Sequence, residues 1–194
     1  MSKIKSLCVF CGSRAGVDPA HEVAAQDLGH AIADRGIELI YGAGDIGLMG
    51  VVARAALENG GKVTGIIPEF IQAFEVGSPG EIELIVVESM HERKRAMFER
   101  SDGFIALPGG LGTLDETIEM ITWKQLQQHK KPVVLVDTNH YWKPFLELVQ
   151  AVVDGGFGHH GINDLFSVVD NVESVFQALE DAPEPAAEVL TSHL

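Results

Sequence analysis

Basic residues are scarce in this chain, with 14 Lys and Arg against 28 Asp and Glu and a formal net charge of −14 at pH 7. A chain of that sign repels the phosphate backbones of DNA and RNA, so nucleic acid is not an expected partner. Long hydrophobic runs are also lacking: none approaches the ~20 apolar residues of a membrane span, and the first apolar stretch is too short for a signal peptide. We therefore expect a cytoplasmic protein with no membrane partner.

Cysteine is equally scarce, with two residues in the chain. Cys8 and Cys11 have the C-x-x-C spacing of redox pairs, but Cys8 lies inside an apolar run, whereas redox pairs sit at a helix N-terminus that lowers the thiol pKa. Residues i and i+3 of a strand also point to opposite faces, so the pair is predicted to be structural. His159 and His160 are adjacent in a glycine-rich loop with no third ligand at useful spacing. Neither a metal nor another cofactor is expected.

Short apolar segments, by contrast, are abundant, and helical patterns separate them. Such an alternation indicates a parallel sheet covered by helices on both faces, because its strands are apolar throughout and do not alternate. We predict an α/β fold with a Rossmann-like, doubly wound sheet of six to seven strands. The predicted strands are 4–10, 37–41, 62–67, 82–87, 103–107 and 132–136, with a weaker one at 165–169; the predicted helices are 19–35, 47–58, 89–100, 113–128, 143–153 and 171–180.

The chain of 194 residues is long enough for one domain with its own hydrophobic core, and no linker or internal repeat divides it. We predict a single domain over residues 1–180. Residues 181–194 combine two prolines with acidic residues and alanines, which is typical of a flexible tail. Residues 68–81 form one long irregular connection, and this makes them a candidate wall or lid of a site.

Glycine-rich loops follow three of the predicted strands, at Gly12-Ser13, Gly42-Ala43-Gly44 and Gly109-Gly110. The carboxyl ends of parallel strands share one edge of the sheet, and ligands of open α/β sheets bind there. The segment Pro108–Glu116 is the most informative of the three, since its glycines let backbone N–H groups approach an anion closely. A helix predicted from Thr113 adds unpaired N–H groups and the positive end of its dipole. The sequence therefore predicts a phosphate site at this loop.

Two interpretations of Glu116 follow from the residues alone. Thr113-x-x-Glu116 fits a capping box, in which the glutamate only bonds the backbone N–H of Thr113. One turn into a phosphate-binding helix, the same carboxylate would lie beside whatever carries the phosphate. The spacing does not decide between them.

A basic cluster, Arg93-Lys94-Arg95, follows a capping box formed by Ser89 and Glu92. One interpretation is a solvated helix face whose charges are paired locally. The other is a binding role, because the cluster precedes the Pro108 loop by one helix and one strand, and successive elements are usually neighbours. In so acidic a chain, a small anionic substrate needs a local cluster of this kind.

The segment Gly42–Gly47 fits Gly-x-Gly-x-x-Gly after a strand, the dinucleotide fingerprint. It follows the second predicted strand, however, and not the first. The acidic residue expected about 20 positions further on is not clear, with Glu69 the nearest candidate. NAD(P) binding is therefore a weak rival.

Several motifs together resemble the Lonely-guy (LOG) family of cytokinin-activating phosphoribohydrolases, over roughly residues 4–155. The motif Pro-Gly-Gly-x-Gly-Thr-x-x-Glu at 108–116 carries most of the resemblance. The supporting segments, in family order, are Phe10-Cys11-Gly12-Ser13, Gly47-Leu48-Met49-Gly50, Met90-His91-Glu92-Arg93-Lys94 and Ile121-Thr122-Trp123. One departure is Ala43, which stands where the family usually shows a third glycine.

The resemblance implies a Rossmann-like nucleotide-binding domain that hydrolyses the N-glycosidic bond of a nucleoside 5′-monophosphate. The substrate is AMP or a cytokinin riboside 5′-monophosphate, and the products are free base and ribose 5-phosphate. It also implies a homodimer or higher homo-oligomer, and catalytic roles for Arg93 and Glu116. The substrate-contacting residues that it implies are Glu75, Arg93, Lys94, Gly110, Leu111, Gly112, Thr113 and Thr122.

Two other functions stay open. Molybdenum-cofactor carrier proteins share the fold and a similar glycine loop, and a carrier or sensor of that type would bind its ligand without turnover. An NAD(P)-dependent oxidoreductase would use the Gly42 loop. Members of the family have often been labelled lysine decarboxylases, but that chemistry needs a pyridoxal Schiff-base lysine in its own phosphate site, which this sequence does not supply.

Overall fold

The computed structural model describes residues 4–73 and 80–183. Its strands are β1 (Ser6–Phe10), β2 (Glu38–Tyr41), β3 (Val63–Pro68), β4 (Glu83–Val87), β5 (Gly103–Ala106), β6 (Val133–Val136) and β7 (Ser167–Val169). Its helices are α1 (Ala20–Asp34), α2 (Gly47–Glu58), α3 (Glu69–Gln72), α4 (Met90–Arg100), α5 (Leu111–Gln125), α6 (Lys143–Asp154) and α7 (Val175–Glu180), with 3₁₀ turns η1 (Thr138–His140) and η2 (His160–Leu165).

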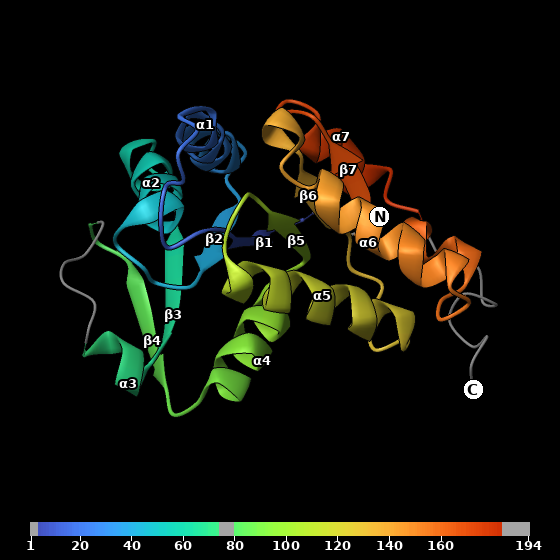
Figure 1. Cartoon of the computed structure of the whole chain (residues 1–194). Helices are drawn as coiled ribbons and strands as arrows, with labels where there is room; N and C mark the ends of the chain where they lie inside the picture. Colours follow the sequence, from blue (N-terminus) through green and yellow to red (C-terminus); the bar gives the residue numbers. More distant parts are fainter. Residues whose placement is uncertain (1–3, 74–79, 184–194) are drawn as a thin grey trace.

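The seven strands form one parallel sheet in the order β4-β3-β2-β1-β5-β6-β7 (Figure 1). Strand β1 lies at its centre, with Leu7 paired to Leu39 of β2 on one side and to Gly103 of β5 on the other. From β1 the chain first builds the sheet toward β4 and then returns to build toward β7. The strand order therefore reverses between β1 and β5, which is the point where doubly wound sheets bind ligands. The predicted α/β Rossmann-like fold class is confirmed.

Two hydrophobic clusters fill the two faces of the sheet. Helices α1, α2 and α7 cover one face, and α4 and α5 cover the other (Figure 1). Cys11 belongs to the first cluster and Cys8 to the second, so the two thiols point to opposite faces of the sheet. Both are buried and free, and burial raises the pKa of each thiol. The structural interpretation of this cysteine pair is confirmed.

The predicted elements are present, including the weak strand, but some boundaries differ. Helix α5 begins two residues before the predicted start, and α7 begins at Val175, four residues later than predicted. The connection predicted to be irregular over 68–81 contains the short helix α3, while residues 74–79 lie outside the described part. Residues 184–194 of the predicted tail also lie outside it, so the tail and the domain limits stay predictions.

The start of α4 follows the predicted capping box. The hydroxyl of Ser89 accepts from the N–H of Glu92 at 3.2 Å, and the carboxylate of Glu92 accepts from the N–H of Glu88 at 2.9 Å. This cap fixes where the helix begins, and therefore which face carries the basic cluster. Over the described residues, no helix is both long and apolar enough to cross a membrane.

Candidate active site

Three loops meet at the carboxyl edge of the sheet, beside the β1–β5 pair (Figure 1). The N–H of Gly12 donates to the carbonyl oxygen of Pro108 at 3.0 Å, which joins the loop after β1 to the loop after β5. The carbonyl oxygen of Gly12 accepts from the N–H groups of Leu48 and Met49 at 3.0 and 3.3 Å, which joins the first loop to the start of α2. The predicted convergence of the glycine loops is confirmed.

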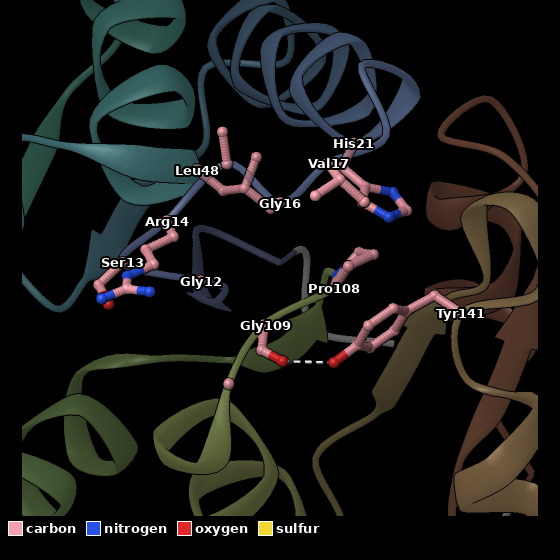
Figure 2. A pocket seen from close by; sticks show the side chains of 12 residues that line it. Gly12, Ser13, Arg14, Gly16, Val17, His21, Leu48, Pro108, Gly109 and Tyr141 are labelled. Atoms are coloured by element: carbon pink, nitrogen blue, oxygen red, sulfur yellow. Dashed lines mark hydrogen bonds between the residues drawn. The ribbon is translucent and has the colours of Figure 1, made fainter.

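A cavity of about 560 Å³ opens between these loops (Figure 2). Cavities of roughly 300–1,000 Å³ hold small-molecule ligands, so its size suits a nucleotide. The β1–α1 loop lies on one side, and the Pro108–Gly110 turn and Tyr141 lie on the other. The lining residues are Gly12, Ser13, Arg14, Ala15, Gly16, Val17, His21, Leu48, Pro108, Gly109, Gly110 and Tyr141.

Helix α5 begins at Leu111 with Gly110 as its N-cap, and no side chain caps it. Thr113 therefore lies inside the first turn, where its buried hydroxyl packs against Gly109. The capping-box interpretation of Thr113 and Glu116 is wrong, because Thr113 is past the cap and its side chain faces inward. The N–H groups of the first turn of α5 follow Gly110, and a Cβ added at Gly110 or Gly112 would meet open space. This end of the helix keeps the anion-binding character predicted for it.

Glu116 lies on the buried face of α5, with 8% of its surface exposed. Its Oε1 is 3.8 Å from Nη2 of Arg93. Burial raises the pKa of Glu116 from 4.5 to about 7, and the charge of Arg93 offsets part of that rise. A carboxyl group that titrates near neutral pH suits acid–base chemistry, and such groups concentrate at functional sites. Helix capping no longer accounts for this glutamate.

The guanidinium of Arg93 is fixed by four contacts, one of them from Nη1 to Sδ of Met90 at 3.9 Å. Its Nε donates to the carbonyl oxygen of Ile66 at 3.2 Å, and Nη2 donates to that of Gly42 at 3.3 Å. The remaining contact is the ion pair with Glu116. Because Ile66 belongs to β3 and Gly42 follows β2, the Arg93 side chain crosses the ends of two strands to reach the carboxylate. The interpretation as a solvated helix face is wrong for Arg93, whose side chain is only 11% exposed.

Lys94 faces two acidic side chains of α5. Its Nζ lies 3.1 Å from Oδ2 of Asp115 and 3.1 Å from Oε2 of Glu119. Burial alone would lower the pKa of Lys94, but the hydrogen bonds and charges of Glu119 and Asp115 together raise it. Two carboxylates therefore already balance this charge, and Lys94 ties α4 to α5 in the structure.

The structure joins α4 to α5 through Arg93, which pairs with Glu116, and Lys94, which pairs with Asp115 and Glu119. The remaining predicted residues of this region, Gly110, Leu111, Gly112 and Thr113, form the N-terminal end of the same helix. Gly110 lines the cavity, and the Arg93–Glu116 pair lies outside its lining. Thr122 is exposed, about 9 Å further along the axis of α5 than Glu116 and on a different face. Glu75 lies outside the described residues. The catalytic and binding roles of all these residues stay predictions.

The protein's own side chains fill the Gly42–Gly47 loop, which matches the dinucleotide fingerprint. A Cβ at Gly42 would overlap the guanidinium of Arg93, and one at Gly44 would lie 2.6 Å from Cε of Met49. These glycines therefore make room for the side chains of Arg93 and Met49, so packing within the chain accounts for them without a bound dinucleotide. Ala43 between them has a φ of 60°, the left-handed region that favours glycine, which accounts for the glycine usual in the family.

His159 and His160 lie at the start of the 3₁₀ turn η2. The ring Nδ1 of His159 accepts from the N–H of Gly161 at 3.1 Å and so caps η2. Within residues 4–73 and 80–183, no three His, Cys, Asp or Glu side chains are grouped so as to hold a metal ion.

Three side chains that line the cavity were not predicted from the sequence. Arg14 is exposed in the β1–α1 loop and directly follows the glycine turn, which was its one local signal. His21 and Tyr141 meet edge to face, with ring centroids 5.8 Å apart. The hydroxyl of Tyr141 donates to the carbonyl oxygen of Gly109 (Figure 2). His21, Gly109 and Tyr141 are far apart in the sequence, so no local pattern predicts these contacts.

Known proteins resemble the chain in both sequence and fold. A family model described as "Possible lysine decarboxylase" matches residues 49–179. The cytokinin riboside 5′-monophosphate phosphoribohydrolase LOG7 of Arabidopsis thaliana is 39% identical over 193 residues, which cover 100% of this chain and 88% of the relative. LOG5 of the same plant is 43% identical over 179 residues, 92% of this chain and 78% of the relative.

Among solved structures, the molybdenum cofactor carrier protein of Chlamydomonas reinhardtii superimposes with a TM-score of 0.69 at 24% identity. The match covers 93% of this chain and 98% of that one. At this identity the likeness establishes a shared fold.

The buried carboxyl group predicts how replacing Glu116 changes stability with pH. Because its pKa is higher in the folded chain, about 7 against an ordinary 4.5, folding favours the protonated form. Its contribution to stability is full below pH 4.5 and is lost as the pH rises through about 7. Glu116→Gln should therefore be more stable than the parent at pH 8, by up to about 3 kcal/mol, and nearly equal to it at pH 4.5.

Urea unfolding of both proteins at these two pH values measures the difference. Glu173→Gln, which removes one exposed carboxylate, is the matched control and should follow the parent at both. A Glu116→Gln protein that is less stable than the parent at pH 8 contradicts the account, because it would show that pairing with Arg93 outweighs burial.

Proposed function

The chain belongs to the LOG family of cytokinin riboside 5′-monophosphate phosphoribohydrolases, and from this premise we propose that it hydrolyses the N-glycosidic bond of nucleoside 5′-monophosphates. Its substrates are AMP-like nucleotides, including those with an N6-substituted adenine, and its products are free base and ribose 5-phosphate. The observation that carries this proposal is the buried Glu116–Arg93 pair, on the same helix whose N-terminus is open at Gly110.

The 5′-phosphate binds the backbone N–H groups at Gly110, Gly112 and Thr113. The helix dipole favours an anion at this position, and a Cβ added at Gly110 or Gly112 would meet open space. In a chain with a formal charge of −14, such directed N–H groups and the exposed cation Arg14 offset the general repulsion of an anionic substrate. Lys94 contributes less to phosphate binding than the sequence suggested, because Asp115 and Glu119 already hold it.

Bond cleavage leaves the electron pair of the C1′–N bond on the base and develops positive charge on the ribose. A water oxygen then bonds to C1′, and the base leaves with a proton. Glu116 either stabilises the cation or takes the proton of the attacking water, and both roles require its ionised form. Arg93 orients this carboxylate, since its guanidinium is already locked by two backbone carbonyl oxygens.

The rival functions find less support. A carrier is favoured only by fold similarity at 24% identity, whereas the phosphoribohydrolase relatives reach 39% and 43%. NAD(P) binding is disfavoured because Arg93 and Met49 fill the glycine fingerprint. A pyridoxal-type decarboxylase needs a lysine amine available for a Schiff base, and Lys94, the lysine beside the α5 glycine turn, is paired with two carboxylates.

We also propose that the chain forms a homodimer through the outer face of α5. Exposed apolar side chains follow one stripe of this helix and its end, with Leu111 85%, Ile118 46% and Leu126 43% exposed. Thr122 lies on the same stripe, so a contact of Thr122 with substrate would be made in the partner's site. Light scattering after size-exclusion chromatography tests the dimer, and a species of 20.9 kDa would contradict it.

Turnover on AMP and N6-isopentenyl-AMP tests the function directly, with both parent nucleosides run beside them. We expect release of free base and equal ribose 5-phosphate from the monophosphates alone. Glu116→Gln should lower kcat by at least about a thousandfold, because its contribution is made in the transition state. Phosphate-dependent binding without any base release would instead favour the carrier, and near-normal turnover by Glu116→Gln would remove this residue from the mechanism.

The pH dependence of the reaction follows from the same carboxyl group. Since Glu116 acts ionised and burial raises its pKa to about 7, kcat/KM should rise as the pH increases from 5.5 and level off above about 8. The substrate phosphate also titrates near pH 6, so the affinity for ribose 5-phosphate is measured over the same range and its pH dependence divided out. A corrected profile that stays flat across neutrality contradicts the assignment.

A further inference from the structure

Tyr141 makes a hydrogen bond directly to the glycine loop. Its hydroxyl donates to the carbonyl oxygen of Gly109, the residue before the N-cap of α5 (Figure 2). The two residues come from different connections, since Gly109 follows β5 and Tyr141 follows β6. This bond is therefore a tie between neighbouring loops of the crevice, outside the Arg93–Glu116 pair.

The Gly109 carbonyl and the Gly110 N–H belong to one planar trans peptide, so they point in opposite directions. A carbonyl held toward Tyr141 thus turns the Gly110 N–H away from the tyrosine. Across the described residues, that N–H has no hydrogen-bond partner, and the space at Gly110 is open. Accepting a bond at the oxygen also polarises the peptide, which makes its N–H a stronger donor.

The turn that carries Tyr141 is held in an unfavourable backbone conformation. Asn139 and His140 both lie in the left-handed region, with φ values of 52° and 60°. Neither is glycine, the residue that adopts this region at no steric cost, although asparagine and histidine adopt it more readily than most others. The buried carboxylate of Asp137 anchors the far side of the turn by accepting from the N–H of Trp142 at 2.6 Å. Strain that the fold maintains in this way is typical of a functional position.

We propose that Tyr141 is a positioning residue for substrate binding: it fixes the Gly109–Gly110 peptide so that the Gly110 N–H donates to the 5′-phosphate. This role rests on the proposed phosphoribohydrolase function. Tyr141 acts through the peptide and makes no contact with the reacting atoms, so it changes affinity for the phosphate more than the rate of bond cleavage.

The Tyr141 ring also packs against its neighbours. It meets the buried Trp142 edge to face at 5.4 Å between centroids, and His21 at 5.8 Å. Tyr141→Phe keeps both ring contacts and removes only the hydroxyl, so it separates positioning from packing.

The experiment measures the binding of ribose 5-phosphate, AMP and adenosine to the parent and to Tyr141→Phe by calorimetry, with KM and kcat for AMP beside them. Loss of one hydrogen bond predicts an affinity about three- to tenfold weaker for ribose 5-phosphate and AMP. Adenosine affinity and kcat at saturation should stay near the parent values, and so should the thermal midpoint. Asn139→Gly is the matched control: it removes the 2.7 Å hydrogen bond from Asn139 to Asp18 of the β1–α1 loop, and glycine keeps the positive φ accessible.

Unchanged phosphate affinity in Tyr141→Phe overturns the proposal, and so does an equal loss for adenosine, which would indicate general disruption. A larger phosphate loss in Asn139→Gly than in Tyr141→Phe would also overturn it, because the rigidity of the turn, and not the tyrosine hydroxyl, would then explain the effect. Ribose 5-phosphate binding needs no turnover. A parent chain that binds it but releases no base refutes the proposed activity while leaving the role of Tyr141 measurable.

Discussion

The site depends on one interaction, the contact of a buried carboxylate with a guanidinium that the backbone holds in place. Arg93 is anchored by the carbonyl oxygens of Ile66 and Gly42, and it meets Glu116 at 3.8 Å. The ends of β2 and β3, the start of α4 and the buried face of α5 must all be in register for this contact to form. The charge of Arg93 offsets only part of the effect of burial, so the pKa of Glu116 is about 7. A carboxyl group with this pKa suits acid–base chemistry, and its burial in ionised form disfavours the folded state at higher pH.

The reversal of strand order between β1 and β5 brings the loops of the site together. Loops that lead to helices on opposite faces of the sheet meet there, and hydrogen bonds join them in pairs. Gly12 bonds Pro108, Tyr141 bonds Gly109, and Asn139 bonds Asp18. These bonds fix the orientation of the N-terminal end of α5, and a site that is oriented in advance lowers the entropy lost on binding. In the proposed function, the phosphate binds the glycine turn that lines the cavity, and the Glu116–Arg93 pair supplies the chemistry.

Much of this arrangement follows from local sequence patterns. Apolar runs such as Leu7 to Phe10 predict buried parallel strands, and the glycines after them mark the binding edge. The predicted start of α5 is two residues too late, because Gly110 caps the helix without a side chain, whereas Thr113 is a residue type that commonly caps helices. The contact of Tyr141 with Gly109 has no local signal, since it requires two non-glycine residues with positive φ in the preceding turn. Tertiary packing decides such positions.

The most direct measurement is a crystal structure of Glu116→Gln with AMP bound, because that variant should bind the nucleotide without cleaving it. The account predicts the phosphate on the N–H groups of Gly110 and the first turn of α5, with C1′ as the ribose atom nearest residue 116. A phosphate bound by Lys94 away from the glycine turn, or a C1′ remote from residue 116, would contradict it.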